Sequence, residues 1–204
     1  MQSALSHLED AYKVACDDLL NLSAEIHIYR QLFVHNDSEK TALLNDAAGA
    51  FFFIAQQSLF QTIVMRLTRF AEKGGSGKNA KLSLDHLVQA SRKIANSDQS
   101  QRLVQLRREF CSKAKRAIPL RNKIFAHSDL AHAMAGTRSR FGLSMKEIRA
   151  SYDTAATLLN EVGSLLDKPF MVFDLPEFGL AGRDGEALVE TLRRAQQYAA
   201  NQLK

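Results

Sequence analysis

Apolar side chains recur along the first segment of the chain at alternating spacings of three and four residues. The series is Leu5, Leu8, Tyr12, Ala15, Leu19, Leu22, Ile26, Tyr29 and Phe33. This heptad spacing places them on one stripe of a helix, so we expect a long helix over about residues 3–34. Asn36, with Glu39 three residues later, is expected to cap the helix that follows. The pattern leaves open whether the stripe packs against the same chain or against a second subunit.

A second long helix is expected over about residues 38–72. Its centre is an unbroken apolar run, Phe51–Ile54, which a helix distributes around its whole circumference, so we expect this part to be buried. Residues 47–65 contain no charged side chain, which raises the question of a membrane span. The same stretch carries Gln56 and Gln57, whose amides are costly to place in hydrocarbon. A buried central helix in a protein with no membrane partner is therefore expected.

A glycine-rich segment, Lys73–Asn79, follows the second helix and is expected to be a loop. Its sequence resembles a phosphate-binding loop, but Glu72 stands where the first glycine of that motif belongs, and Asn79 stands where a serine or threonine belongs. The segment also follows a helix rather than a strand. We therefore do not expect nucleotide binding here.

The middle of the chain predicts two helices and a break. Ser83 is expected to cap a short third helix, and a fourth helix is expected to begin at Asp98 or Ser100. The side chains of the fourth helix that are expected to face inward are Leu103, Leu106 and Phe110. Pro119 lacks an N–H donor and clashes with the preceding turn, so a kink or a restart is expected there. A helical piece over about residues 118–128 follows.

The last third of the chain predicts two more helices, separated by an irregular segment. Ser144 and Glu147 have the spacing of a capping box, which predicts the start of a long helix. Residues 169–182 lack helical periodicity, and a short extended stretch is expected at 170–173. Asp184 is expected to cap the final helix.

These elements predict an all-α protein, an up-and-down helical bundle with two long first helices and a C-terminal helical tail. We expect residues 1–168 to form the bundle and residues 169–204 to form an irregular segment plus a helix, packed on the bundle or extending it. The composition agrees, because 204 residues include only ten glycines and three prolines, too few for a turn-rich β fold. Two cysteines and a first segment without the features of a signal peptide lead us to expect a cytoplasmic location.

Positive charge is concentrated in one stretch of the sequence. The chain carries 27 basic and 22 acidic residues, a net charge of +5, and between Arg102 and Lys123 the only acid is Glu109. Attraction to a phosphate backbone is one interpretation, and its candidate RNA-binding residues are Arg107, Arg108, Lys113, Lys115, Arg116 and Lys123. A solvated helix face that keeps the protein soluble is the other interpretation, and the local charge does not decide between them.

The basic stretch ends in the string Arg121-Asn122-Lys123-Ile124-Phe125-Ala126-His127-Ser128-Asp129. An arginine, a polar residue, a short spacer and a histidine, late in a helical bundle, resemble the signature of the HEPN superfamily (higher eukaryotes and prokaryotes nucleotide-binding). The longer string is similar to the bacterial abortive-infection U-type branch of that superfamily. Two earlier segments, Ile63–Leu67 and Leu82–Leu84, fit the same branch, and the resemblance covers most of residues 1–168.

The resemblance implies a metal-independent endoribonuclease of bacterial defence or toxin–antitoxin systems, or an inactive relative that binds RNA or a partner protein. In the active case Arg121 and His127 are the catalytic residues, and Asn122 and Asp129 support them. No cofactor is then expected, and a cognate antitoxin protein is expected as a partner. The residue types suit this chemistry, because a neutral histidine accepts a proton from a ribose 2′-hydroxyl and an arginine stabilises charge on the phosphate. The sequence contains neither a His-Glu-x-x-His string nor a closely spaced cysteine pair to hold a metal ion.

Alternatives to catalysis remain open at the level of sequence. His127 shares a helical stripe with Leu120 and Ile124, so it can equally be a hydrogen-bonded core residue. A regular helix places His127 about 120° around and about 9 Å along from Arg121. Because one helix does not direct both side chains to one phosphate, we expect a two-fold homodimer in which two copies of the motif share a cleft, as the resemblance also implies. A structural helical adaptor, assembled through the first helix, is the remaining alternative.

Overall fold

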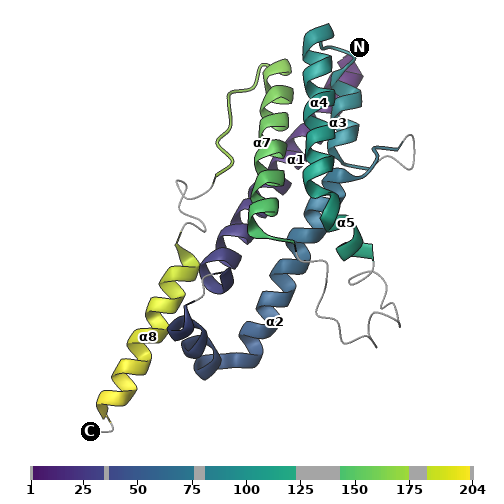
Figure 1. The fold of residues 1–204 in the computed structure, drawn as a ribbon. Coiled ribbons are helices and arrows are strands. Elements are labelled where there is room, and N and C mark those ends of the chain that lie inside the picture. The colour runs from purple at the N-terminus through teal and green to yellow at the C-terminus, as the bar shows by residue number, and fades with distance from the viewer. Residues whose placement is uncertain (1, 35–36, 76–80, 123–142, 175–182, 203–204) are drawn as a thin grey trace. The chain divides into compact units, whose positions relative to one another are not determined.

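The computed structural model describes residues 2–34, 37–75, 81–122, 143–174 and 183–202 (Figure 1). These residues form helices α1 (Gln2–Tyr29), α2 (Ser38–Ala71), α3 (Leu84–Ser91), α4 (Ser97–Lys113), α5 (Ala117–Leu120), α7 (Met145–Leu165) and α8 (Asp184–Gln202). A π-helical turn, η1 (Arg30–Val34), extends α1, and a 3₁₀ turn, η3 (Ala114–Arg116), joins α4 to α5. No strand occurs among the described residues, and the prediction of an all-α protein is confirmed.

The chain divides into two compact units. The first unit comprises Met1–Asn21 and Val64–Phe173, and the second comprises Leu22–Ile63 and Asp174–Lys204. Helices α1 and α2 contribute residues to both units, so neither unit is one continuous stretch of sequence. The expected division at residue 168 stays a prediction, because compactness alone does not show which part of a chain folds by itself.

The first unit is built on the packing of α4 against α7, and α3 contacts both helices. The inward side chains of α4 are Leu103, Leu106 and Phe110, as the sequence predicts, and all three are buried. The buried stripe of α7 consists of Ile148, Tyr152, Ala155, Leu159 and Val162. The ring of Phe110 meets the ring of Phe70 edge to face, with 6.4 Å between the ring centroids. The core therefore joins α4 to the C-terminal part of α2 as well as to α7.

The heptad stripe of α1 is covered by the chain itself within the first unit. Leu8, Tyr12 and Leu19 are buried there. In the same unit Arg66 of α2 donates from Nη1 to Oδ1 of Asp18 at 2.8 Å. The question that the sequence left open is settled for this part of the stripe, which packs against its own chain.

Two helix starts expected from the sequence are confirmed, and a third is corrected. Ser83 accepts a hydrogen bond at the start of α3, and Ser144 and Glu147 form the capping box of α7. Helix α4 begins earlier than expected, because Asn96 and Gln99 form a capping box that satisfies the first free N–H groups there.

Two more helix starts differ in detail from the sequence-based expectation. Asp37 caps α2, because its Oδ1 accepts a hydrogen bond from the N–H of Lys40 at 3.0 Å. Asn36, the expected cap, lies outside the described residues. Asp184 is the first residue of α8 rather than its cap. Its carboxylate still lies at the end of the helix that favours negative charge.

The expectation that the whole middle of α2 is buried is wrong. The small core of the second unit consists of Leu32, Leu43, Leu44, Phe52 and Val189. In contrast, Phe51, Phe53 and Ile54 are each 63% exposed, and we call these three side chains the apolar face of α2. The core covers one side of the helix only, and the backbone leaves helical geometry at Ala48, where φ is −168° and ψ is 64°. The sequence is therefore apolar on all sides of the helix here, although other apolar side chains cover only one side.

Helix α2 is also long and apolar enough to cross a membrane. Its most apolar window of 18 residues has a mean hydropathy of 1.3, and 17% of that window is buried. Core helices of soluble proteins pass the same test of length and composition, so one such helix is weak support for a membrane span. The sequence-based expectation of no membrane partner stays a prediction.

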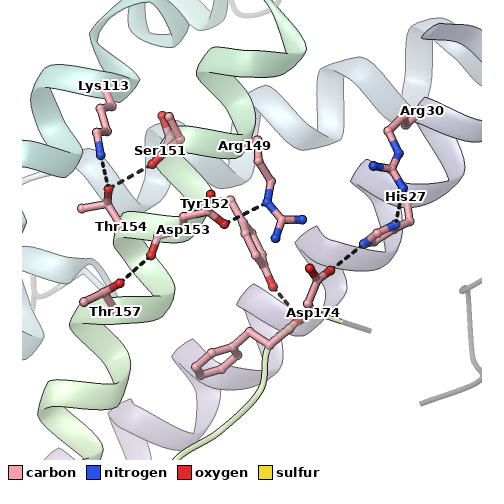
Figure 2. Close-up of polar contacts among 12 residues, drawn as sticks. His27, Arg30, Lys113, Arg149, Ser151, Tyr152, Asp153, Thr154, Thr157 and Asp174 are labelled. Atoms are coloured by element: carbon pink, nitrogen blue, oxygen red, sulfur yellow. Dashed lines mark hydrogen bonds and ion pairs between the residues drawn. The ribbon is translucent and has the colours of Figure 1, made fainter. Parts of the chain in front are cut away.

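The chain that follows α7 is fastened to that helix by side-chain hydrogen bonds. Asn160 donates from Nδ2 to the carbonyl of Met171 at 3.0 Å and accepts from the N–H of Met171 at 2.8 Å. The hydroxyl of Tyr152 donates to the carbonyl of Phe173 (Figure 2). Residues 170–173, where a short extended stretch is expected, lie against α7 and form no strand.

His27 is a buried titratable residue of the second unit, at 3% exposure. Its Nε2 lies 2.8 Å from Oδ1 of Asp174, and its Nδ1 lies 3.4 Å from Nη2 of Arg30 (Figure 2). The histidine has partners on both ring nitrogens, which makes it a satisfied buried polar residue.

Candidate functional site

Arg121 lies directly after α5, in a helical backbone conformation. The 3₁₀ turn η3 precedes α5, and this is the interruption that Pro119 predicts. Ala117 and Leu120 anchor the short helix, because both side chains are buried in the first unit. The backbone at Arg121 is therefore fixed by its neighbours, while 26% of the Arg121 side chain remains exposed.

The guanidinium of Arg121 binds two side chains. Its Nη1 donates to Oε1 of Glu72, and its Nε donates to Oδ1 of Asn122 at 3.0 Å. The two motif residues that the structure describes, Arg121 and Asn122, are thus in direct contact. An arginine carries five N–H donors, so donors remain for a further anion.

Glu72 is the site residue that the sequence did not identify. It follows the last residue of α2 and is separated from Arg121 by 49 positions. Its second oxygen, Oε2, accepts a hydrogen bond from Nζ of Lys81 at 2.8 Å. The hydrogen bond from Lys81, followed by that from Arg121, lowers the pKa of the Glu72 carboxyl below its ordinary value. The carboxylate is therefore ionised at neutral pH.

The loop that begins at Glu72 is braced against α3. The N–H of Gly74 donates to Oδ2 of Asp85 at 2.9 Å, and the N–H of Lys81 donates to the carbonyl of Gly74 at 2.6 Å. A Cβ atom on Gly74 would lie only 2.9 Å from the backbone of His86, so this close approach requires glycine. The glycine-rich segment that the sequence excluded as a nucleotide loop therefore serves, in its described part, to hold the partner of Arg121.

Comparison with protein families agrees with the residues at this site. The family model HEPN_AbiU2, described as AbiU2, matches residues 4–183. The chain belongs to the AbiU2 family of HEPN proteins. No curated protein and no solved structure matches the chain. The resemblance drawn from the string at Arg121 is confirmed, and the matched range contains that whole string but ends just before α8.

Three of the six candidate RNA-binding residues of this AbiU2-family protein are paired with acids inside the first unit. The ion pairs are Arg107 with Asp85, Lys113 with Glu109, and Arg116 with Glu147. Lys113 also donates from Nζ to Oγ1 of Thr154 at 2.8 Å (Figure 2). Arg108 and Lys115 are exposed and have no ion pair among the described residues. The positive field is therefore weaker than the sequence suggests, and RNA binding by these residues stays a prediction.

The carboxylate of Glu147, one of these acids, interacts with both Ser144 and Arg116. Its carboxylate accepts hydrogen bonds from the N–H and the hydroxyl of Ser144 and lies 2.8 Å from Nη1 of Arg116. The backbone hydrogen bond from Ser144, then its hydroxyl, then Arg116 lower the pKa of Glu147 to about 2. One acid thus caps α7 and neutralises a cation of the basic stretch at the same time.

Three residues of the predicted site lie outside the described residues. These are Lys123, His127 and Asp129. The choice between a catalytic and a core role for His127 therefore stays as the sequence left it. In the part of the chain that the structure describes, no group of three or more His, Cys, Asp or Glu side chains could hold a metal ion. The expectation that neither metal nor cofactor is needed stays a prediction.

Proposed function

We propose that this AbiU2-family protein is a metal-independent endoribonuclease of bacterial defence or toxin–antitoxin character, with RNA as its substrate. The observation that carries the proposal is the string from Arg121 to Asp129 within the family match. The geometry at Arg121 supports it, because a half-buried guanidinium with two fixed bonds and unused donors suits a phosphate.

In the proposed reaction, neutral His127 accepts the proton of a ribose 2′-hydroxyl as that oxygen attacks the adjacent phosphorus. The bond from phosphorus to the 5′-oxygen of the next nucleotide breaks, and this oxygen takes up a proton from solvent. The products are a 2′,3′-cyclic phosphate and a 5′-hydroxyl end. Arg121 stabilises the negative charge that grows on the phosphate oxygens. Asn122 supports Arg121 through its bond to Nε, and Asp129 fixes the tautomer of His127.

The proposed active form is a cytoplasmic homodimer with two-fold symmetry. A regular helix separates Arg121 and His127 by about 9 Å along its axis, which does not bring both to one phosphate. Two copies of the motif that face each other supply Arg121 from one protomer and His127 from its partner to a shared cleft. A cognate antitoxin protein is the further partner that this class of function calls for.

Cleavage of single-stranded RNA by the purified protein in EDTA tests the proposal. We expect products with 2′,3′-cyclic phosphate ends, and we expect Arg121→Ala and His127→Ala to lose cleavage. Arg194→Ala is the matched control, because it removes an exposed positive charge from α8, outside the family match. Full activity in both motif variants would overturn the assignment.

A mixture of protomers tests the shared cleft. An Arg121→Ala protomer combined with a His127→Ala protomer should restore one complete site per dimer and part of the activity. A monomer at micromolar concentration in light scattering, or no recovery in the mixture, contradicts the shared cleft while leaving the fold untouched.

A non-catalytic protein-binding module is the second candidate function, and the apolar face of α2 favours it. Phe51, Phe53 and Ile54 expose apolar surface on the part of α2 that the core of the second unit leaves uncovered, and exposed apolar surface of this kind is typical of interaction sites. RNA binding at low ionic strength distinguishes the two candidates, because attraction to phosphates is strongest there. A binding module of this class shows no RNA affinity even under that condition.

A further inference from the structure

One carboxylate joins two cations next to the proposed site. Glu72 accepts from Nη1 of Arg121 at Oε1 and from Nζ of Lys81 at Oε2. The Glu72 side chain is 24% exposed and that of Arg121 is 26% exposed, so most of the pair is shielded from water. An ion pair in this setting restrains geometry more than a fully exposed pair, which water and salt weaken.

Glu72 is itself held in place. It directly follows α2, and two residues later Gly74 is bound to Asp85 and packed against the backbone of His86. A free arginine side chain loses considerable rotamer entropy when a ligand orders it. Because Arg121 is already ordered by an acid on a braced segment, most of that cost is absent when the guanidinium meets the charge that develops on the phosphate in the transition state.

The pair leaves Arg121 able to bind a phosphate. Its Nε and Nη1 are engaged, whereas Nη2 has no partner within the described ranges. Arg121 and Lys81 together carry two positive charges against the single negative charge of Glu72. The group therefore keeps a net positive charge and still attracts an anion.

We propose that Glu72 is the positioning residue of Arg121 in RNA cleavage, with Lys81 holding its other oxygen. The inference rests on the proposed function and deepens it, since neither residue belongs to the string from Arg121 to Asp129. Glu72 touches Arg121 and not the reacting atoms. It acts by fixing the guanidinium where negative charge develops.

The proposal has a kinetic signature that a purely structural role lacks. An acid beside a phosphate site repels RNA, so removing Glu72 should leave KM unchanged or lower it. The same change releases Arg121 from its orientation, so kcat should fall. A residue that only stabilises the fold would instead change the folded fraction and leave kcat per folded molecule as it was.

Steady-state cleavage of a short single-stranded RNA in EDTA provides the first test. We expect Glu72→Ala to lower kcat by about tenfold to a hundredfold without raising KM. Glu72→Gln keeps an acceptor oxygen and should lose less, about threefold to tenfold. Glu161→Gln is the matched control, because it removes the acid of another ion pair in the same unit, 3.7 Å from Arg102, and should keep its kcat. A kcat for Glu72→Ala within twofold of the parent, or a raised KM with unchanged kcat, overturns the inference.

A second test needs no activity. The Nη1–H resonance of Arg121, the group that donates to Glu72, is assigned by its absence in Arg121→Lys and reports the order of the guanidinium in ¹⁵N-labelled protein. We expect a dispersed, slowly exchanging signal in the parent and in Glu161→Gln, and a rapidly exchanging one in Glu72→Gln. An unchanged signal in Glu72→Gln overturns the positioning role. If the parent protein does not cleave RNA at all, the proposed function fails, and this signal alone decides whether Glu72 orders Arg121.

Discussion

Helix α4 and the middle of helix α2 carry opposite chemistries, and the rest of the chain treats them differently. Acids of α3 and α7 pair with Arg107 on α4 and with Arg116 on the turn that follows it. The apolar face of α2, in contrast, is 63% exposed at each of its three side chains. The sequence of a helix thus determines which side chains lie on its surface, whereas the residues that contact this surface come from distant parts of the chain.

The largest predicted loss of unfolding free energy comes from a substitution on the inward side of α4. Phe110 is fully buried and packs edge to face on Phe70. We expect Phe110→Ala to lower the free energy of unfolding by about 3–5 kcal/mol, because the substitution leaves a cavity between α4 and α2. Urea denaturation followed by circular dichroism measures it. A loss below about 1 kcal/mol would mean that α4 is not packed as described.

A smaller effect is predicted for the acid that pairs with α4 from another helix. Asp85 accepts from the N–H of Gly74 and pairs with Arg107, and its side chain is 16% exposed. We expect Asp85→Asn to cost about 1–3 kcal/mol of unfolding free energy, since it removes charge from a partly buried network. Asp153→Asn is the matched control, because its exposed pair with Arg149 lies within α7 and contributes little. Equal losses in the two variants would show that pairing across helices is no stronger than pairing along one.

Much of the fold follows from local sequence patterns. The heptad stripe from Leu8 to Leu19, the cap at Ser83 and the capping box at Ser144 each predict an element that the structure contains. The apolar run at Phe51–Ile54 misleads, because burial depends on what lies opposite a helix and not on the helix alone. Periodicity determines which face is apolar, but not whether that face finds a partner.

Some residues of the candidate site are likewise predictable from the sequence, and others are not. Arg121 and Asn122 stand out in a recognisable string, so sequence identifies them. Glu72 and Lys81 do not, because a single acid or lysine beside a glycine-rich loop has no local pattern that distinguishes it from other surface charges. They are identified as site residues only through the hydrogen bond between Arg121 and Glu72. These two residues are 49 positions apart in the sequence and meet only in the folded chain.

A third prediction concerns the pH at which Glu147 loses its interactions with Ser144 and Arg116. The pKa of Glu147 lies at about 2 instead of its ordinary 4.5, so the folded state favours the ionised form. The stabilisation of the folded state by ionised Glu147 is therefore fully present above about pH 4.5 and is lost as the pH falls towards about 2. We expect the Tm of the parent to fall more steeply over this window than the Tm of Glu147→Gln, which has no carboxylate to protonate. Parallel Tm curves for the two proteins would contradict this contribution.

The smallest predicted effect lies on the apolar face of α2. Phe53→Ala should change the free energy of unfolding by less than about 0.5 kcal/mol, because the ring is 63% exposed and little of it leaves water on folding. Phe52→Ala is the matched control, one position away on the same helix. Its ring is 6% exposed in the core of the second unit, so we expect a loss of about 3 kcal/mol or more.

The contrast between these neighbouring phenylalanines tests the comparison directly, because the substitution is the same and only the surroundings differ. Successive helical side chains point about 100° apart, which suffices to put one ring in the core and the next in solvent. Urea titrations at two protein concentrations sharpen the test. If the loss of unfolding free energy in Phe53→Ala grows with protein concentration, another copy of the chain covers the apolar face of α2. Assembly would then bury this face, just as folding buries the inward side of α4. If the loss of unfolding free energy is small and independent of protein concentration, the apolar face of α2 stays exposed, in contrast to the inward side of α4.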